Sequence, residues 1–391
     1  MRGTRIGTRP ILGTRTTMAR LIRTAFVPHG DREHGNMLDP VNDTVTVSAL
    51  FQAYYDCRVT KRNSSSALKF EENLERNLMD LYYELLSGQY QPGRSTVFVV
   101  QHPKVREVWA ADFRDRIVHH LLYNHIADRF HRRFIFDSYA CIPGKGTHKA
   151  VARVEHFSRS VTKNHQIPGF VLKMDVANFF VSINRFVLED LMEPYIPEPW
   201  WWNLVRTVLH RDPVPDAIIV GRPEMMRKVP KHKSLFHAPL NTGLPIGSLN
   251  SQFAANIVLN VVDQYAKHEL KLTHYVRYVD DITVFSTDAK YLATIPAKID
   301  ALMQSALLLK LHPNKTSINK VEHGFDALGY VIRPNSRYLR RSTVRNGVRK
   351  IKGLCRSRAD DETVRQTAHS YFGIFGHANS WNLQGKLAAY L

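Results

Sequence analysis

The stretch that decides the fold is Tyr278-Val279-Asp280-Asp281, which separates the apolar segments 274–277 and 282–285. Side chains alternate between the two faces of a strand, so neighbouring carboxylates can approach one site only at a sharp turn. The pattern therefore predicts a β-hairpin with both acids at its tip, where a divalent cation would neutralise their repulsion. The alternative is a solvated Asp-Asp turn, because Asp favours turns by bonding to the nearby backbone.

A third acid favours the metal. Residues 170–175 read as a buried strand that ends at Asp175, with Leu172 and Met174 on the face opposite to this acid. Ligands bind at the carboxyl ends of strands in such sheets. A strand-end Asp followed later in the chain by an Asp-Asp hairpin resembles the metal-binding pattern of palm-type nucleotidyl transferases. There, two Mg²⁺ ions activate a primer 3′-hydroxyl and stabilise the leaving pyrophosphate.

Several segments, taken in order, resemble successive motifs of reverse transcriptases. They are residues 173–180, 243–252, 277–281 and 328–330. The run Ile246-Gly247-Ser248-Leu249-Asn250-Ser251-Gln252 resembles the form found in diversity-generating retroelements, whereas group II intron, retron and retroviral enzymes usually have Gln-Gly and Ser-Pro there. Residues 113–120, 144–148, 329–330 and 339–342 also resemble segments of this subfamily. The resemblance extends from about Val47 to the end of the sequence.

This resemblance implies an α+β, right-hand polymerase fold with fingers, a palm that has a ferredoxin-like βαββαβ sheet, and a helical thumb. The expected segments are a basic flexible arm at 1–45, fingers at 46–165, a palm at 166–335 and a basic thumb at 336–391. A Pro-rich basic insertion occupies 194–240, and Trp200-Trp201-Trp202 is expected to open a helix within it. Strands are expected over 96–100 and 105–109, and a helix over 297–308. Three readings of the arm stay open: RNA binding, a dispensable extension, or organellar targeting.

Charge indicates a polyanionic partner. The chain of 391 residues has 54 Lys plus Arg against 35 acids, a net charge of +19. Neutralising phosphates releases counterions and drives nucleic-acid binding. A generally basic, solubilising surface is the alternative, but basic residues cluster with aromatics in 222–236 and 337–365, as base stacking requires.

Other features of composition bear on location. No run of about 18 apolar residues occurs, so no membrane span is expected. The three cysteines have no metal-ligand spacing and are expected to be buried thiols of a reducing compartment. We therefore expect a cytoplasmic protein, and the resemblance implies one that is bacterial or phage-encoded.

The resemblance implies the following metal site. Two Mg²⁺ ions, or Mn²⁺ in their place, are expected on Asp175, Asp280, Asp281 and the backbone carbonyl of Val176, because Mg²⁺ takes oxygen ligands in octahedral array. Lys315 matches a family lysine that protonates or neutralises departing pyrophosphate, with a solvent-facing lysine in a turn as the alternative.

Nucleotide contacts are also implied by the resemblance. The triphosphate would be gripped by Arg106, Arg114 and Arg116, for which ordinary pairing with nearby acids is the alternative. The sugar and base would be contacted by Phe179, Phe180, Ile246, Gly247 and Gln252. The ring of Phe180 would exclude a ribose 2′-hydroxyl, unless it is only a packing residue. Ile246 stands where most relatives have a Gln that can hydrogen-bond to the nascent pair, which implies lower discrimination.

The implied primer and template contacts are Tyr278, Gly329, Tyr330, Arg340 and Arg341. The predicted protein is an RNA-directed DNA polymerase of a diversity-generating retroelement, error-prone at template adenines as the subfamily implies. Its ligands would be dNTPs, template RNA and the RNA/DNA duplex, and its partner a small helical-bundle accessory protein. The alternatives are a defence-associated or retron-like bacterial reverse transcriptase and, from another class, a maturase-like RNA-binding protein that does not polymerise.

Overall fold

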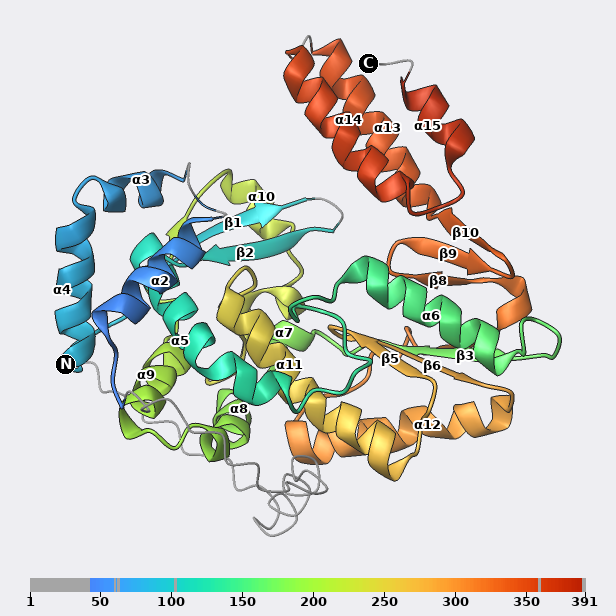
Figure 1. Ribbon diagram of the computed structural model, residues 1–391, viewed down its shortest axis with the longest axis horizontal. Helices are drawn as coiled ribbons and strands as arrows, with labels where there is room; N and C mark the ends of the chain where they lie inside the picture. Colours follow the sequence, from blue (N-terminus) through green and yellow to red (C-terminus); the bar gives the residue numbers. More distant parts are fainter. Residues whose placement is uncertain (1–42, 60, 62–63, 102–103, 358–359, 389–391) are drawn as a thin grey trace. The chain divides into compact units, whose positions relative to one another are not determined.

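The computed structural model describes residues 43–59, 61, 64–101, 104–357 and 360–388 (Figure 1). Nearly all of the predicted N-terminal arm therefore lies outside the described residues. The chain forms two compact units. The first comprises the residues up to Ile135, Val176–Leu270 and Ile299–His312, and the second comprises Phe136–Asp175, Lys271–Lys298 and Pro313–Leu391. These units do not coincide with the predicted fingers, palm and thumb, whose boundaries stay predictions.

The first unit is mainly helical. Its N-terminal helices are α2 (Val47–Arg58), α3 (Ser65–Glu71), α4 (Leu74–Leu86) and α5 (Phe113–His131). Its later helices are α7 (Phe179–Ser182), α8 (Arg185–Met192), α9 (Pro199–His210), α10 (Pro223–Arg227) and α11 (Leu249–Gln264). Side chains cap α2 and α5 at their starts, where Thr46 and Asp112 accept hydrogen bonds from backbone N–H groups. α2 packs against α5, and α11 is buried along almost its whole length.

A small sheet belongs to the same unit. β1 (Thr96–Val100) pairs antiparallel with β2 (Arg106–Ala110), which confirms the two strands expected there. The insertion adds β4 (Ile218–Ile219), parallel to β1. It also contains α9, which begins at Pro199 as expected for the Trp run, and Trp201 is only 2% exposed. The insertion is thus folded into the unit through both a strand and a buried helix face.

The second unit contains a four-stranded antiparallel sheet in the order β5-β6-β3-β7. Its strands are β3 (Phe170–Met174), β5 (Tyr275–Tyr278), β6 (Asp281–Ser286) and β7 (Ser317–Lys320). The first strand in the chain therefore lies between the third and the fourth, which is the ferredoxin-like arrangement predicted for the palm. α6 (Thr147–Val161) packs on β5 and β6, and its Val154 and Phe157 join a core with Val171, Val276 and Phe285.

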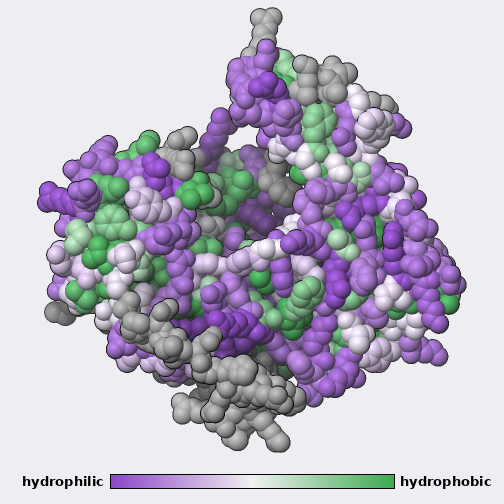
Figure 2. Space-filling view, viewed as in Figure 1, coloured by the Kyte–Doolittle hydropathy of each residue, from purple (hydrophilic) through white to green (hydrophobic). Residues whose placement is uncertain are grey.

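The C-terminal part of this unit has a second sheet and three helices. The sheet consists of β8 (Phe325–Ala327), β9 (Tyr330–Arg333) and β10 (Ser336–Leu339), and the helices are α13 (Arg341–Arg356), α14 (Asp361–Phe375) and α15 (Trp381–Ala388). Ile351, Ala368 and Phe375 form a small buried core. The basic residues of α13 are exposed, and Figure 2 shows hydrophilic residues, with a few hydrophobic ones between them, on the visible face of these helices.

The structure corrects two expectations. The helix expected over 297–308 begins earlier, as α12 (Ala289–Leu302), and continues as a π-helix through Leu307. Pro296 lies inside α12, and the fully buried Leu292, Ile295 and Ile299 show that the apolar face is continuous past it, which offsets the missing hydrogen bond. The cysteines were expected to be buried, but only Cys57 is, whereas Cys141 and Cys355 are exposed. No helix in the described residues is long and apolar enough to span a membrane.

Candidate active site

The predicted catalytic hairpin is present in the second unit. β5 and β6 pair antiparallel with Tyr278 opposite Asp281, so Val279 and Asp280 form the turn. Val279 has a φ of +52°, in the left-handed region that β-branched residues rarely adopt. Such a conformation costs about 1–3 kcal/mol and persists only where its surroundings hold it. The hairpin tip is therefore a strained turn that needs support from neighbouring groups.

Arg277 provides that support, although the motif itself pointed only to the carboxylates. Its side chain is fully buried, and its Nη1 donates to the carbonyl oxygen of Val279 at 3.1 Å. Its backbone N–H donates a hydrogen bond to the carbonyl oxygen of Asp137 at 2.9 Å, and its carbonyl oxygen accepts one from the N–H of Tyr139 at 3.1 Å. A buried guanidinium is costly unless it is hydrogen-bonded. The sequence did contain one indication of this role, because Arg277 is a charged residue within an apolar strand that packs in the core.

The sheet register brings the three predicted metal ligands together. β3 and β6 are antiparallel with Met174 opposite Ile282, so Asp175, one residue further, comes opposite Asp281. Burial, and then the negative charges of Asp281 and Asp175, raise the pKa of Asp280 to about 6. The three carboxylates thus lie close enough to repel one another. This electrostatic arrangement suits a bound cation.

Lys315 lies at the same place. Its Nζ is 2.8 Å from both carboxylate oxygens of Asp175, so the ammonium partly neutralises this acid. In the described part of the chain, no three His, Cys, Asp or Glu side chains are close enough together to hold a metal ion. The three carboxylates would therefore have to move closer together to bind one. They offer oxygen donors only, which fits Mg²⁺. Val176 belongs to the first unit, where it forms a bridge with Leu311, and its carbonyl ligand role stays a prediction.

The predicted primer and template residues of the second unit differ in exposure. The hydroxyl of Tyr278 lies 2.8 Å from Thr147 Oγ1 at the start of α6. The ring of Tyr330 is only 2% exposed and belongs to the core, so a primer contact there would have to come from the backbone of Gly329 and Tyr330. Arg340 pairs with Asp326 at 3.2 Å, and Arg341 is exposed at the start of α13. These roles stay predictions.

The residues predicted to contact the sugar and base lie in the first unit. The carbonyl oxygen of Phe180 accepts a hydrogen bond from Leu244 N–H at 2.8 Å, so α7 lies directly beside the loop of residues 243–248. Phe179 is buried at 3% exposure, whereas Phe180 and Ile246 are partly exposed. Gly247 and Gln252 are exposed. The structure thus places Phe180 and the loop of Ile246 next to each other.

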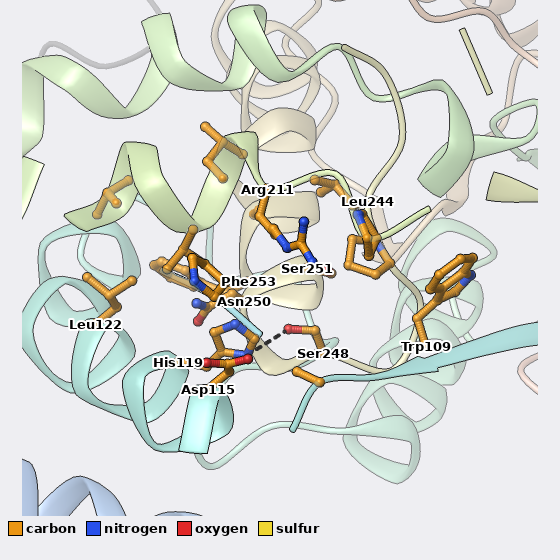
Figure 3. Close-up of a pocket in the computed structure, with 18 of the residues that line it drawn as sticks. Trp109, Asp115, His119, Leu122, Arg211, Leu244, Ser248, Asn250, Ser251 and Phe253 are labelled. Carbon is orange, nitrogen blue, oxygen red and sulfur yellow. Dashed lines mark hydrogen bonds between the residues drawn. The ribbon is translucent and has the colours of Figure 1, made fainter. Parts of the chain in front are cut away.

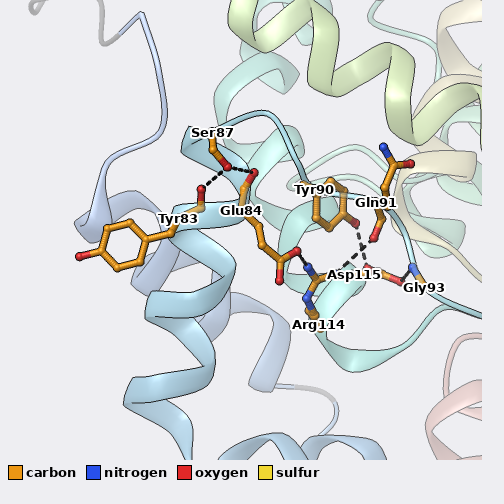
Figure 4. Close-up of polar contacts among 8 residues, drawn as sticks. All are labelled: Tyr83, Glu84, Ser87, Tyr90, Gln91, Gly93, Arg114 and Asp115. Carbon is orange, nitrogen blue, oxygen red and sulfur yellow. Dashed lines mark hydrogen bonds and ion pairs between the residues drawn. The ribbon is translucent and has the colours of Figure 1, made fainter.

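The three arginines predicted to grip triphosphate have different surroundings. Arg106 is exposed on β2. Arg114 forms an ion pair with Glu84 and lies 5.0 Å from the centre of the Tyr90 ring (Figure 4). Arg116 Nε donates to the carbonyl oxygen of Ala111 at 2.8 Å. The ordinary pairing considered for these residues therefore exists at Arg114, and all three phosphate roles stay predictions.

Replacing Phe180 with Ala is expected to let ribonucleotides compete with dNTPs. The ring is partly exposed beside the loop of Ile246, where it can fill the space that a 2′-hydroxyl would need. Single-nucleotide insertion with matched dNTP and rNTP measures the ratio, and Phe98→Ala, which removes an exposed ring of β1, is the control. An unchanged ratio in a folded Phe180→Ala protein would make this ring a packing residue only.

Comparisons with known proteins show the family of this chain. The reverse transcriptase (RNA-dependent DNA polymerase) family matches residues 102–332, more than half of the chain. The chain therefore belongs to the reverse transcriptases, which are RNA-directed DNA polymerases. Protein YkfC of Escherichia coli (strain K12) is 26% identical over 305 residues, which cover 68% of this chain and 74% of that protein.

Two solved structures are also similar. Apo telomerase from Candida tropicalis, truncated from its C-terminal domain, matches with a TM-score of 0.43 and 10% identity, covering 63% of this chain and 55% of that one. Telomerase from Candida albicans, in complex with a fragment of telomeric RNA, matches with a TM-score of 0.45 and 11% identity, covering 65% and 46%. The chain thus spans about half the length of these telomerase chains.

Proposed function

We propose that this protein copies a template RNA into cDNA by phosphoryl transfer at Asp175, Asp280 and Asp281. The observation that carries the proposal is the register that brings Asp175 opposite Asp281 while Asp280 occupies the adjoining strained turn. Two Mg²⁺ ions, or Mn²⁺, would be held by these carboxylates and the Val176 carbonyl, and would activate the primer hydroxyl and stabilise the charge on the leaving group.

The roles of the chain's own side chains follow from their positions. Asp175 and Asp281 face each other across β3 and β6 and would orient the reacting groups. Lys315, with its ammonium 2.8 Å from Asp175, is near enough to neutralise or protonate the departing pyrophosphate. The partly exposed ring of Phe180 would select deoxyribose, and Arg106, Arg114 and Arg116 would bind the triphosphate. The exposed basic residues of α13 would neutralise phosphates of the duplex.

Within this activity, we propose that the polymerase belongs to a diversity-generating retroelement and copies template adenines inaccurately. The support is the run from Ile246 to Gln252 and the partly exposed, apolar side chain of Ile246. An apolar group cannot check the nascent pair through a hydrogen bond, so fewer wrong pairs are rejected. A small helical-bundle accessory protein and a cytoplasmic location in a bacterium belong to the same proposal. Sequencing the RNA and proteins that co-purify with the chain identifies both kinds of partner.

Replacing Ile246 with Gln is expected to lower misincorporation opposite template adenine while substantial extension is kept. One regained hydrogen bond contributes on the order of 1–3 kcal/mol of discrimination, or about ten- to a hundredfold. Sequencing cDNA made on one adenine-rich template by the wild type and the variant measures the change, with Ile246→Leu as the apolar control. If the Gln variant only loses activity, Ile246 is a packing residue, and an accurate wild type would remove the retroelement proposal.

A further inference from the structure

We infer that Glu107 is a positioning residue for Ile246: its buried carboxylate joins the β1–β2 hairpin to the 194–240 insertion and so fixes the loop of residues 243–248. All residues concerned lie in the first unit. The inference rests on the proposed function only in that Ile246 contacts the nascent pair. It also gives the insertion, whose role the motifs left open, a specific task.

The carboxylate of Glu107 is bonded to both elements. Glu107 is only 3% exposed, on β2. Its Oε2 accepts a hydrogen bond from the backbone N–H of Leu235, in the insertion, at 2.9 Å and another from Trp109 Nε1 at 3.3 Å. A buried carboxylate is costly without such donors, and hydrogen bonds to a charged acceptor are the stronger kind. Trp109 and Leu235 also share a small buried cluster with Val97, so the same two residues are joined by apolar packing.

Both residues that Glu107 joins lie directly against the loop. The backbone N–H of Trp109 donates to the carbonyl oxygen of Ile246 at 2.7 Å. A Cβ on Gly247 would lie 2.9 Å from the Trp109 carbonyl oxygen, and a Cβ on Gly243 would lie 2.4 Å from Leu235 Cδ1. Each distance is too short for a side chain, and both glycines have positive φ. The loop backbone is therefore packed onto Trp109 at one end and Leu235 at the other.

A cavity borders part of the loop. Leu244, Pro245 and Ser248, together with Trp109 itself, line this largely apolar cavity of about 100 Å³. Figure 3 shows Ser248 and His119 of α5 pointing toward each other there, with Ser248 Oγ 3.4 Å from His119 Nδ1. Burial lowers the pKa of His119 to about 4, so this contact is between neutral groups. The start of the loop is also held by other elements, because Leu244 N–H donates to the carbonyl oxygen of Phe180 at 2.8 Å and Arg185 Nε donates to that of Gly243 at 3.1 Å. The other end, at Ile246 and Gly247, is held by Trp109 and so depends on the contacts that Glu107 organises.

The test compares Glu107→Ala, Glu107→Gln and a matched control. Gln keeps an oxygen that can accept both hydrogen bonds, whereas Ala keeps none. The control is Glu198→Ala, which removes another buried carboxylate of the same unit, one bonded to Arg129 at 2.6 and 2.7 Å rather than to the loop's supports. Two quantities are measured: backbone amide hydrogen exchange in residues 243–248, and misincorporation with the KM for dNTP during primer extension.

In Glu107→Ala, the backbone amide hydrogens of residues 243–248 are expected to exchange about tenfold faster, because a hydrogen bond to a charged group is lost. It should also raise misincorporation and the dNTP KM several-fold while kcat on correct pairs changes little. Glu107→Gln should restore most of each property, and Glu198→Ala should leave the loop's exchange unchanged. The inference would be overturned if Glu107→Ala had the loop exchange and the error spectrum of the wild type. It would also be overturned if Glu198→Ala changed both properties in the same way as Glu107→Ala. An accurate wild type would refute only the retroelement part of the proposed function, because the exchange result still decides whether Glu107 holds the loop.

Discussion

Asp280→Ala and Asp175→Asn are each expected to abolish cDNA synthesis, lowering the rate by at least about a thousandfold. The two acids come together at the hairpin tip and the end of β3, where they would hold the ions that stabilise the transferred phosphoryl group. Loss of several kcal/mol of transition-state stabilisation corresponds to this factor. Primer extension on an RNA template measures it. RNA binding should stay within a few-fold, because the exposed cations of α13 lie outside the carboxylate cluster.

The control separates chemistry from folding. Asp361→Asn, which changes an exposed acid of α14, should extend primers normally.

Without divalent cations the acids repel one another, and the folded state favours protonated Asp280 because its pKa is raised to about 6. Stability of the metal-free protein should therefore fall as pH rises through about 6, and Asp280→Asn should weaken this dependence. Appreciable polymerisation by Asp175→Asn at saturating Mg²⁺ would count decisively against the assigned site.

Arg277→Met is expected to destabilise the protein by about 1–3 kcal/mol and to reduce polymerisation more than stability alone explains. Met fills much of the same space but cannot donate to the Val279 carbonyl, so the turn with a positive φ loses its support. Chemical unfolding and primer extension measure the two effects. Arg345→Met, at an exposed position of α13, is the control for loss of a positive charge.

A second substitution tests the cause. Glycine adopts a positive φ at no steric cost, so Val279→Gly should recover part of the stability that Arg277→Met loses. Arg277→Lys keeps the charge but presents a point donor instead of a planar fork, and should fall between Met and the wild type. Wild-type stability and activity in Arg277→Met would show that the hairpin tip does not depend on this side chain.

Local patterns were sufficient for the parts of the fold that depend on periodicity. The strand at 96–100, the strand ending at Met174, the hairpin around Asp280 and the helix that opens with the Trp run were all predictable. Each is specified by alternating or continuous apolar residues next to a turn, which is information carried within a few neighbouring positions. The order of the motifs likewise predicted the family that the match over 102–332 confirms.

Local patterns were misleading where burial overrides them. The helix expected over 297–308 would begin just after Pro296, yet the apolar face of α12 continues past this residue. The ring of Tyr330, predicted at the primer, lies in the core, and Arg114, predicted at the triphosphate, is paired with Glu84, so these two roles stay predictions that the pattern could not settle. In each case the partner that decides the outcome is distant in the sequence or belongs to another element, so no short window contains it.

The sequence by itself therefore determined the class of enzyme and the ferredoxin-like sheet, and it supplied the three carboxylates as a prediction, because motifs and periodicity are local properties. Only the tertiary structure decided what holds these parts in place. The support of the hairpin tip by Arg277 and the junction of Glu107 with Leu235 join residues by hydrogen bonds in the core. Such bonds are specified by three-dimensional packing and by the cost of leaving a buried charge without partners, which no sequence spacing records.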